Sequence, residues 1–398
     1  MFKPDKPQRN LIISIVVIAI SITTSSCQKG KNLSPEEGFA SYSLEKEREF
    51  LIHSLSTVEL LDYYPKDSLY LGYTITHSGK EICLVKEDGQ IILSRNMQGE
   101  GPNQHAANLS CLGFAENGDI YAMTSVQVLR YNQNLELLEK FTYEPMQMTT
   151  FYTISKKFNY HLKYTNQSEI IFTVNPSDVS RNNFRSSEAY QYAKLVEFYD
   201  QKDESTKEIG LISERNITEE LLGIVKGFYA PIYILNAITS KLYLTTTLDN
   251  EITIYDMNAD SVSAKINIYY SDPNAIEPSK KISPQTLSKN PDGWLLSPKN
   301  HNIHKLDNGL FALEYHMVSI NPNPNQDIQE YDIDGNVYKN RLILFDQNCQ
   351  LSGDLALPVK GIIMSSIPGN RLLVRVENSE VEEDFTRYVI YKVMKEEE

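Results

Sequence analysis

His301 and His304 come closest to a metal-binding pattern in this sequence. Imidazole nitrogens are common ligands of zinc and other transition metals, and two of them three residues apart could share one ion. The surrounding residues 298–304 (PKNHNIH) have no helical pattern, and Asp307 is the one acidic residue close by in the sequence. We therefore expect no metal site and no cofactor, and we keep His301 and His304 as weak candidates for ligand binding.

Trp294 is the single tryptophan of the chain and lies within residues 292–296 (DGWLL). An exposed indole ring could stack on a carbohydrate, whereas a buried ring would be an apolar anchor covering the fold. The anchor is the favoured interpretation, and Trp294 is a further weak binding candidate.

Two loop-like segments have features of ligand-binding motifs without completing them. Residues 98–103 (QGEGPN) are glycine-rich like a phosphate loop, but no Gly-Lys-Ser/Thr ending and no helical pattern follows. Residues 332–336 (DIDGN) begin like a calcium loop, but the glycine comes too early and the closing glutamate is missing. Both segments are predicted to be turns. Neither a Gly-x-Ser-x-Gly elbow nor a His-Glu-x-x-His motif occurs, so the sequence identifies no catalytic residue.

The first 26 residues have the layout of a secretory signal peptide. A positive segment with Lys3, Lys6 and Arg9 precedes residues 11–22, a run of apolar residues and serine. That run is much shorter than the roughly 20 residues that span a bilayer as a helix. Residues 1–26 are therefore predicted to be a targeting segment and not part of the fold.

Cys27 ends the segment Thr-Ser-Ser-Cys at residues 24–27, which resembles a bacterial lipobox. The resemblance implies that Cys27 receives a diacylglyceryl group and becomes the new N-terminus. Thr24 departs from the pattern, because most lipoboxes have leucine there. The alternative is an ordinary cleaved signal peptide with a chance cysteine at its end.

Residues 27–37 are polar and contain glycine and proline, so they are predicted to be a flexible tether between the lipid and a folded domain. The membrane is then a partner through the lipid anchor, and the expected location is the outer membrane. Residues 28–31 (QKGK) are basic, whereas the segment after the lipidated cysteine is often acidic in surface-exported relatives. Periplasmic and cell-surface orientations both stay open.

Charge and cysteine content narrow the class of protein further. The 398 residues include 38 Lys and Arg against 52 Asp and Glu, for a formal charge of −14. This acidic balance argues against nucleic acid as a partner, because binding to phosphates needs clustered basic residues. After Cys27, the remaining cysteines are Cys83, Cys111 and Cys349, which we expect to be buried free thiols rather than a disulfide pair.

A repeated β-rich unit organises residues 38–398. Six segments open with a turn signal and continue as a strand-like run: residues 68–75, 118–124, 168–174, 240–247, 308–315 and 369–376. A second run follows each of them, and four of these runs end in an aromatic residue and Asp or Asn, at residues 131–132, 199–200, 255–256 and 345–346. Asp and Asn side chains can accept hydrogen bonds from the backbone two residues further on, so a tight turn to a third strand is predicted.

Repetition at this scale, with several strands per unit, predicts an all-β fold: a six-bladed β-propeller closed with an N-terminal strand. The sixth unit lacks an outer strand, which residues 38–44 or 50–61 could supply. Two packed β domains are the alternative. Long polar insertions at residues 146–167, 175–192, 213–236, 271–306 and 317–340 are expected to build a binding face, with a short helix over residues 216–228.

The repeated strand pairs, the lipobox-like Cys27 and residues 99–103 (GEGPN) together resemble the six-bladed β-propeller lipoproteins of Bacteroidetes. That group consists mostly of domains of unknown function and is distantly similar to NHL-type propellers, which bind partners, and to propeller lactonases and lyases. The resemblance covers nearly all of the chain after Cys27.

Two hypotheses for function follow. The first is a lipid-anchored binding module for an unknown protein or glycan ligand, and we expect binding rather than catalysis. The alternative is a hydrolase or lyase with its site at the mouth of the central channel. Converging carboxylates and histidines there would favour the enzyme, and an exposed apolar patch would favour binding.

Overall fold

The structure is a computed structural model that describes residues 38–77, 79–106, 109–124, 127–142, 163–164, 170–174, 192, 194–200, 205–215, 231–236, 238–247, 249–270, 299–318, 338–376 and 384–396. The chain divides into two compact units, Met1–Lys31 and Asn32–Glu398, and every described residue belongs to the second. Among the described residues, no helix is long and apolar enough to cross a membrane.

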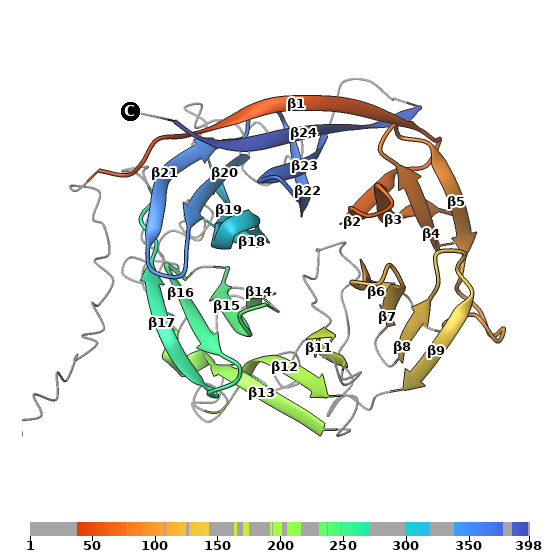
Figure 1. Ribbon diagram of the computed structural model, residues 1–398, viewed down its shortest axis with the longest axis horizontal. Helices are drawn as coiled ribbons and strands as arrows, with labels where there is room; N and C mark the ends of the chain where they lie inside the picture. Colours follow the sequence, from red (N-terminus) through yellow and green to blue (C-terminus); the bar gives the residue numbers. More distant parts are fainter. Residues whose placement is uncertain are drawn as a thin grey trace, which may run out of the picture. The chain divides into compact units, whose positions relative to one another are not determined.

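The second unit is an all-β β-propeller, and its described strands form six four-stranded antiparallel sheets (Figure 1). Three sheets, each given from its innermost strand, are β2 (Val58–Tyr64), β3 (Leu69–Thr76), β4 (Gly79–Lys86), β5 (Ile91–Asn96); β6 (Leu109–Phe114), β7 (Ile120–Thr124), β8 (Gln127–Tyr131), β9 (Leu137–Thr142); and β10 (Lys163–Tyr164), β11 (Ile170–Val174), β12 (Lys194–Asp200), β13 (Ser205–Leu211). The other three are β14 (Pro231–Asn236), β15 (Lys241–Thr246), β16 (Glu251–Asp256), β17 (Ser261–Asn267); β18 (Lys299–Lys305), β19 (Phe311–Val318), β20 (Tyr338–Phe345), β21 (Gln350–Ala356); and β22 (Gly361–Ile367), β23 (Arg371–Val376), β24 (Phe385–Lys395), β1 (Tyr42–His53). Two short 3₁₀ helices, η2 (Ile212–Glu214) and η3 (Asp307–Gly309), lie between strands.

Burial explains why the middle strands have nearly continuous apolar sequences. All five residues of β7 and the last five of β15 are buried, because a strand inside a propeller sheet is covered on both faces. The outer strands β5 and β9 instead alternate between half-buried and exposed residues, since one of their faces meets solvent. Each sheet therefore becomes more polar from its middle to its outer edge.

The hydrophobic core lies between neighbouring sheets. One cluster joins the β14–β17 sheet to the β18–β21 sheet through residues such as Ile254 and Leu313. Another joins the β18–β21 sheet to the sheet of β22, β23, β24 and β1, with Ala312 and Leu372 among its members. The two faces of the β18–β21 sheet thus pack against different neighbours.

The predicted turns are present where the structure describes them. Ser68, Ser240, Asn308 and Asn370 all have a positive φ, between 51° and 57°, just before the second strand of their sheets. At the turn after the third strand, the Asp346 side chain accepts hydrogen bonds from the backbone N–H groups of Asn348 and Cys349. Asn132 and Asp256 make the same kind of turn, which confirms the prediction for three of the four Asp or Asn positions; residues 201–204 lie outside the described part.

The N-terminal strand β1 pairs with β24 along its length, from Tyr42 opposite Lys395 to His53 opposite Phe385. It is the fourth strand of the last sheet, as Figure 1 shows. The two ends of the described chain therefore share one sheet. Residues 38–44 and 50–61 are the two segments predicted to supply the outer strand, and β1 includes parts of both.

Most of the innermost strands lie outside the strand-like runs that the sequence predicts. The expected insertion at residues 271–306 contains β18, and the one at 213–236 contains β14 and overlaps η2. Residues 317–340 likewise overlap the ends of β19 and β20. The sequence of β18, KNHNIHK, has too few apolar residues to be recognised as a strand, because its pairing with β19 and not an apolar pattern defines it. The expected helix at residues 216–228 lies outside the described residues.

The three cysteines after Cys27 are free thiols. Cys83 and Cys111 are buried, as expected, whereas Cys349 is only half-buried because it lies in the turn after β20. Burial raises the pKa of Cys83 to about 12, so this thiol is unreactive at neutral pH.

Candidate functional site

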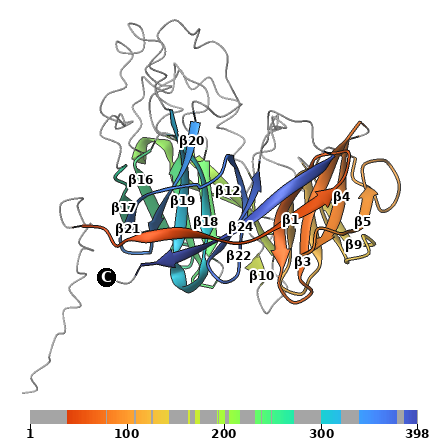
Figure 2. The same cartoon turned by 90° about the horizontal axis from the view of Figure 1, so that it is seen from above.

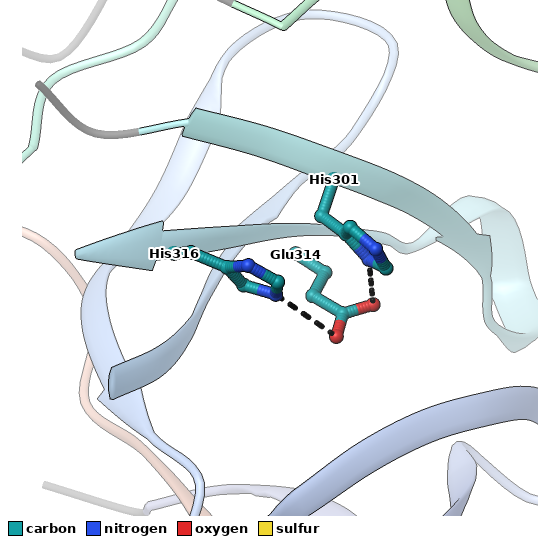
Figure 3. Close-up of side chains that lie close together, drawn as sticks. All are labelled: His301, Glu314 and His316. Atoms are coloured by element: carbon teal, nitrogen blue, oxygen red, sulfur yellow. Dashed lines mark ion pairs between the residues drawn. The ribbon is translucent and has the colours of Figure 1, made fainter. Parts of the chain in front are cut away.

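Four side chains of the β18–β21 sheet form what we call the His–Glu cluster: His301, His304, Glu314 and His316. His301 and His304 lie on β18, the innermost strand, and Glu314 and His316 lie on its neighbour β19. Figure 3 shows His301 and His316 directed at the two carboxylate oxygens of Glu314 from either side. Three of the seven histidines of the chain are thus gathered around one acidic side chain.

A β-bulge aims His301 at this cluster. Asn300 pairs with Tyr315 and Asn302 pairs with Glu314, so that His301 is the extra residue on β18. In a regular ladder, His301 would point to the face opposite Asn302, because side chains alternate along a strand. The bulge breaks this alternation and turns His301 toward the face that carries Glu314.

Glu314 is fully buried, and its carboxylate is the centre of the cluster. His304 Nε2 lies 2.9 Å from Glu314 Oε2, within hydrogen-bond distance. His301 Nδ1 lies 3.5 Å from the same oxygen, and His316 Nε2 lies 4.0 Å from Oε1. A buried carboxylate needs such partners, since removing an unpaired charge from water is strongly unfavourable.

The histidines differ in their access to solvent. The His304 side chain is 3% exposed, whereas those of His301 and His316 are 24% and 26% exposed. The rings of His301 and His316 are stacked, with centroids 4.5 Å apart and planes at 22°. The cluster therefore has a closed side at His304 and an accessible side formed by the two stacked rings.

The start of β18 is fixed to the neighbouring β14–β17 sheet by a buried amide. Asn300 Nδ2 donates hydrogen bonds to the backbone oxygens of Thr246 and Asp249, and Tyr270 Oη donates to Asn300 Oδ1. Burial raises the pKa of Tyr270, so its hydroxyl stays protonated and keeps this role. These contacts fix the backbone at Asn300, the residue that precedes His301.

His301 and His316 lie toward the end of the sheet where β18 begins and β19 ends, whereas Glu314 and His304 lie further along the two strands. The strands run between two faces of the propeller, as Figure 2 shows from above. Because the sheets repeat one antiparallel order, the first strand of each sheet starts, and the second ends, at this face. The longest connections leave and re-enter the described strands here: residues 143–162, 175–193, 212–230, 268–298 and 319–337.

The structure brings together two of the four residues singled out from the sequence. His301 and His304 both contact Glu314, but Asp307, the acidic residue nearest in sequence, lies at the other end of β18. Asp307 accepts a hydrogen bond from the backbone N–H of Gly369 in a neighbouring turn. Cys27 and Trp294 lie outside the described residues, as do residues 332–336.

The glycine-rich residues 98–103 form a turn, as predicted. Gln104 donates its backbone N–H to the Gly101 oxygen, and its side-chain oxygen accepts the Gly101 N–H. Gln98 and His105 form an isolated bridge that closes the segment. The backbone N–H and oxygen of Gly101 are thus used within the turn, and the Asn103 oxygen accepts a hydrogen bond from the Tyr131 hydroxyl.

Glu314 and His316 are not among the candidate site residues predicted from the sequence. The run of residues 308–315 was recognised as a strand, but Glu314 was not recognised as a site residue. One signal was present: a glutamate inside the apolar sequence FALEY is unusual, because charged residues are rarely buried without partners. His316 stands two positions later, on the same face of the strand.

Comparisons with known proteins concern the fold. No family model matches this chain, and no curated protein matches it. The chain is similar to the crystal structure of a member of the DUF4221 family from Bacteroides vulgatus, with a TM-score of 0.61, 13% sequence identity, and coverage of 90% of this chain and 99% of that one. A protein from Bacteroides fragilis has a TM-score of 0.48 and 11% identity over 90% of this chain and 96% of its own. The likeness to the first protein shows the fold alone.

Proposed function

We propose that this protein is a lipid-anchored β-propeller of the bacterial cell envelope that binds a polar ligand at the His–Glu cluster. One observation carries the proposal: two partly exposed histidines converge on a buried carboxylate at the face with the longest connections. Binding sites in scaffold folds are usually built where long loops meet a rigid element.

We propose further that the six sheets are the six blades of one closed ring. Each sheet has four strands, and β1 supplies the outer strand of the last sheet by pairing with β24. A sheet shared by the two ends of the described chain links the first and last blades and so closes the ring. Such a frame holds the cluster rigidly.

The polar character of the cluster favours a glycan or another polar ligand over an apolar protein surface. The described large apolar side chains that are exposed belong to separate elements, for example Leu55 before β2 and Ile238 before β15. Isolated exposed apolar residues are normal on protein surfaces, whereas protein-binding patches are contiguous.

The converging histidines and carboxylate also favour the enzyme alternative, a hydrolase or lyase. A histidine beside a carboxylate can transfer protons at neutral pH, and the accessible pair His301 and His316 could contact a substrate. Catalysis would require conversion of the bound ligand, so turnover of any ligand identified by binding separates the two functions.

The binding proposal is tested with the full chain, purified in detergent, on a glycan array and in a metabolite screen. We expect a bound compound whose affinity falls at least about tenfold in His316→Ala, because one wall of the accessible side is removed. His77→Asn is the matched control, since His77 is exposed and lies outside the cluster. A compound that binds equally well to both variants would place the binding site elsewhere.

The anchor is tested at the N-terminus. Mass spectrometry of the membrane-extracted protein is expected to find a diacylglyceryl group on Cys27 as the first residue. Cys27→Ala is expected to prevent this modification and to release the protein from the outer-membrane fraction. An unmodified N-terminus in the natural sequence would contradict the lipoprotein assignment, and protease treatment of intact cells distinguishes a surface from a periplasmic orientation.

A further inference from the structure

We propose that His301, Glu314 and His316 bind a divalent transition-metal ion, for which Zn²⁺ is the suitable probe. This departs from the expectation from sequence, which considered only residues near His301 along the chain and found no suitable acidic ligand there. Glu314 is that ligand, and the pairing of β18 with β19 brings it into position.

The donor atoms match this class of ion. One atom each from His301, Glu314 and His316 lies within 4.8 Å of the others. Two imidazole nitrogens and one carboxylate oxygen are ligands that zinc and similar metals prefer, whereas calcium and magnesium prefer oxygen ligands alone. The donor set therefore selects a transition metal over the hard cations.

The distances require only small side-chain movements. Ligand atoms around a tetrahedral zinc ion, with bonds of about 2.0–2.2 Å, lie about 3.3–3.6 Å apart. Glu314 Oε2 lies 3.5 Å from His301 Nδ1, and Glu314 Oε1 lies 4.0 Å from His316 Nε2. The two stacked rings must rotate so that their buried nitrogens, His301 Nδ1 and His316 Nε2, converge on one point.

His304 is a positioning residue for this site. Its Nε2 lies 2.9 Å from Glu314 Oε2, and it is buried behind the carboxylate. A hydrogen bond to the ligating carboxylate fixes its orientation, as is usual around protein-bound metals. His304→Gln is expected to weaken metal binding by about 10- to 100-fold and to leave the stoichiometry unchanged.

Three protein ligands leave an open coordination position, which is typical of catalytic and ligand-binding zinc sites. The His301 Nδ1, His316 Nε2 and Glu314 Oε1 atoms are buried, whereas other atoms of the two histidine side chains are partly exposed, so a bound ion would lie just beneath the ring edges. The inference rests on the proposed function in one respect: the ion would be the group that contacts the polar ligand.

The test is a Zn²⁺ titration of the full chain, with any affinity tag removed, in competition with a chelator of known affinity. We expect one Zn²⁺ per chain. His316→Asn and Glu314→Gln each remove a ligand atom, so their binding is expected to weaken by at least the roughly 10- to 100-fold expected for loss of the supporting His304. His77→Asn is expected to bind like the natural sequence, since it removes an exposed histidine away from the cluster. Absence of stoichiometric binding, or equal binding by His316→Asn, would overturn the proposal.

A second measurement uses only the natural sequence, because a variant at buried Glu314 can fail to fold. Histidine modification by diethyl pyrocarbonate is mapped by mass spectrometry with and without Zn²⁺. We expect Zn²⁺ to protect His301 and His316 from modification but not His77. If Zn²⁺ leaves the modification of all three histidines unchanged, the proposed site is wrong. Zinc is the only ligand in both experiments, so their failure would leave the ligand-binding proposal standing.

Discussion

Glu314 and Asp62 are two acidic residues that the fold encloses in different ways. Glu314 is surrounded by three histidines, which can supply positive charge at the carboxylate. Asp62, after the bulge in β2, instead accepts backbone hydrogen bonds from Tyr63 and from Phe114 in the neighbouring sheet. The residue as a whole is half-buried, but its carboxylate is enclosed, and burial raises its pKa to about 6.

Asp62 therefore makes stability depend on pH. A carboxyl whose pKa is higher in the folded state than its ordinary value of 3.8 favours folding below about pH 4, and this contribution is lost as pH rises through about 6. Asp62→Asn cannot titrate, although at every pH it loses one of the two backbone hydrogen bonds, because its amide nitrogen cannot accept one. Between pH 4 and 6.5, the natural sequence is expected to lose up to about 3 kcal/mol relative to Asp62→Asn. Urea unfolding across this pH range measures the free energy of unfolding of both proteins. If the two free energies change in parallel with pH, the prediction is wrong.

An Asp or Asn side chain recurs in the turn after the third strand of several sheets. Asp346, Asp256 and Asn132 occupy the same position in three sheets, and each accepts hydrogen bonds from backbone N–H groups further along the turn. The same local requirement recurs because the chain must reverse direction between the third and fourth strands of every sheet except the last, whose fourth strand is β1. This requirement can be met by Asp or Asn, but not by a residue without a side-chain acceptor.

Asp346→Ala and Asp346→Asn separate this turn chemistry from charge. Alanine removes the acceptor for the N–H groups of Asn348 and Cys349, and a loss of about 1 kcal/mol in unfolding free energy is expected. Asparagine retains an acceptor, as Asn132 does naturally, and is expected to stay within about 0.5 kcal/mol of the natural sequence. Chemical denaturation measures both variants; equal losses would show that the negative charge, and not the hydrogen bonds, is what matters.

At the scale of the whole molecule, side chains join the last sheet to the first. Tyr388 on β24 donates a hydrogen bond from its hydroxyl to the Val58 oxygen and accepts one from the Leu60 N–H, both on β2. Phe50 on β1 stacks on Tyr388 and on Tyr70 of β3. Residues more than 300 positions apart in the chain therefore form one packed interface.

Tyr388→Phe tests how much the hydrogen bonds of the Tyr388 hydroxyl contribute to the free energy of unfolding. The substitution keeps the ring and its stacking but leaves the Val58 oxygen and the Leu60 N–H without their hydroxyl partner inside the core. A loss of about 1–3 kcal/mol is expected, measured by urea unfolding. Tyr192→Phe is the matched control, because Tyr192 is 70% exposed. An unchanged unfolding midpoint in Tyr388→Phe would mean that the two sheets do not depend on these bonds.

The β-rich repeat and its turns can be predicted from the sequence, because these depend on neighbouring residues: apolar runs, Asp or Asn acceptors and left-handed positions such as Ser240. The innermost strand β18 was not recognisable, since its polar sequence is stabilised by pairing with β19. Only the tertiary structure decided the site. The bulge at His301 and the register of β18 with β19 bring Glu314 and His316 to a histidine more than ten residues away, and no local pattern encodes that register.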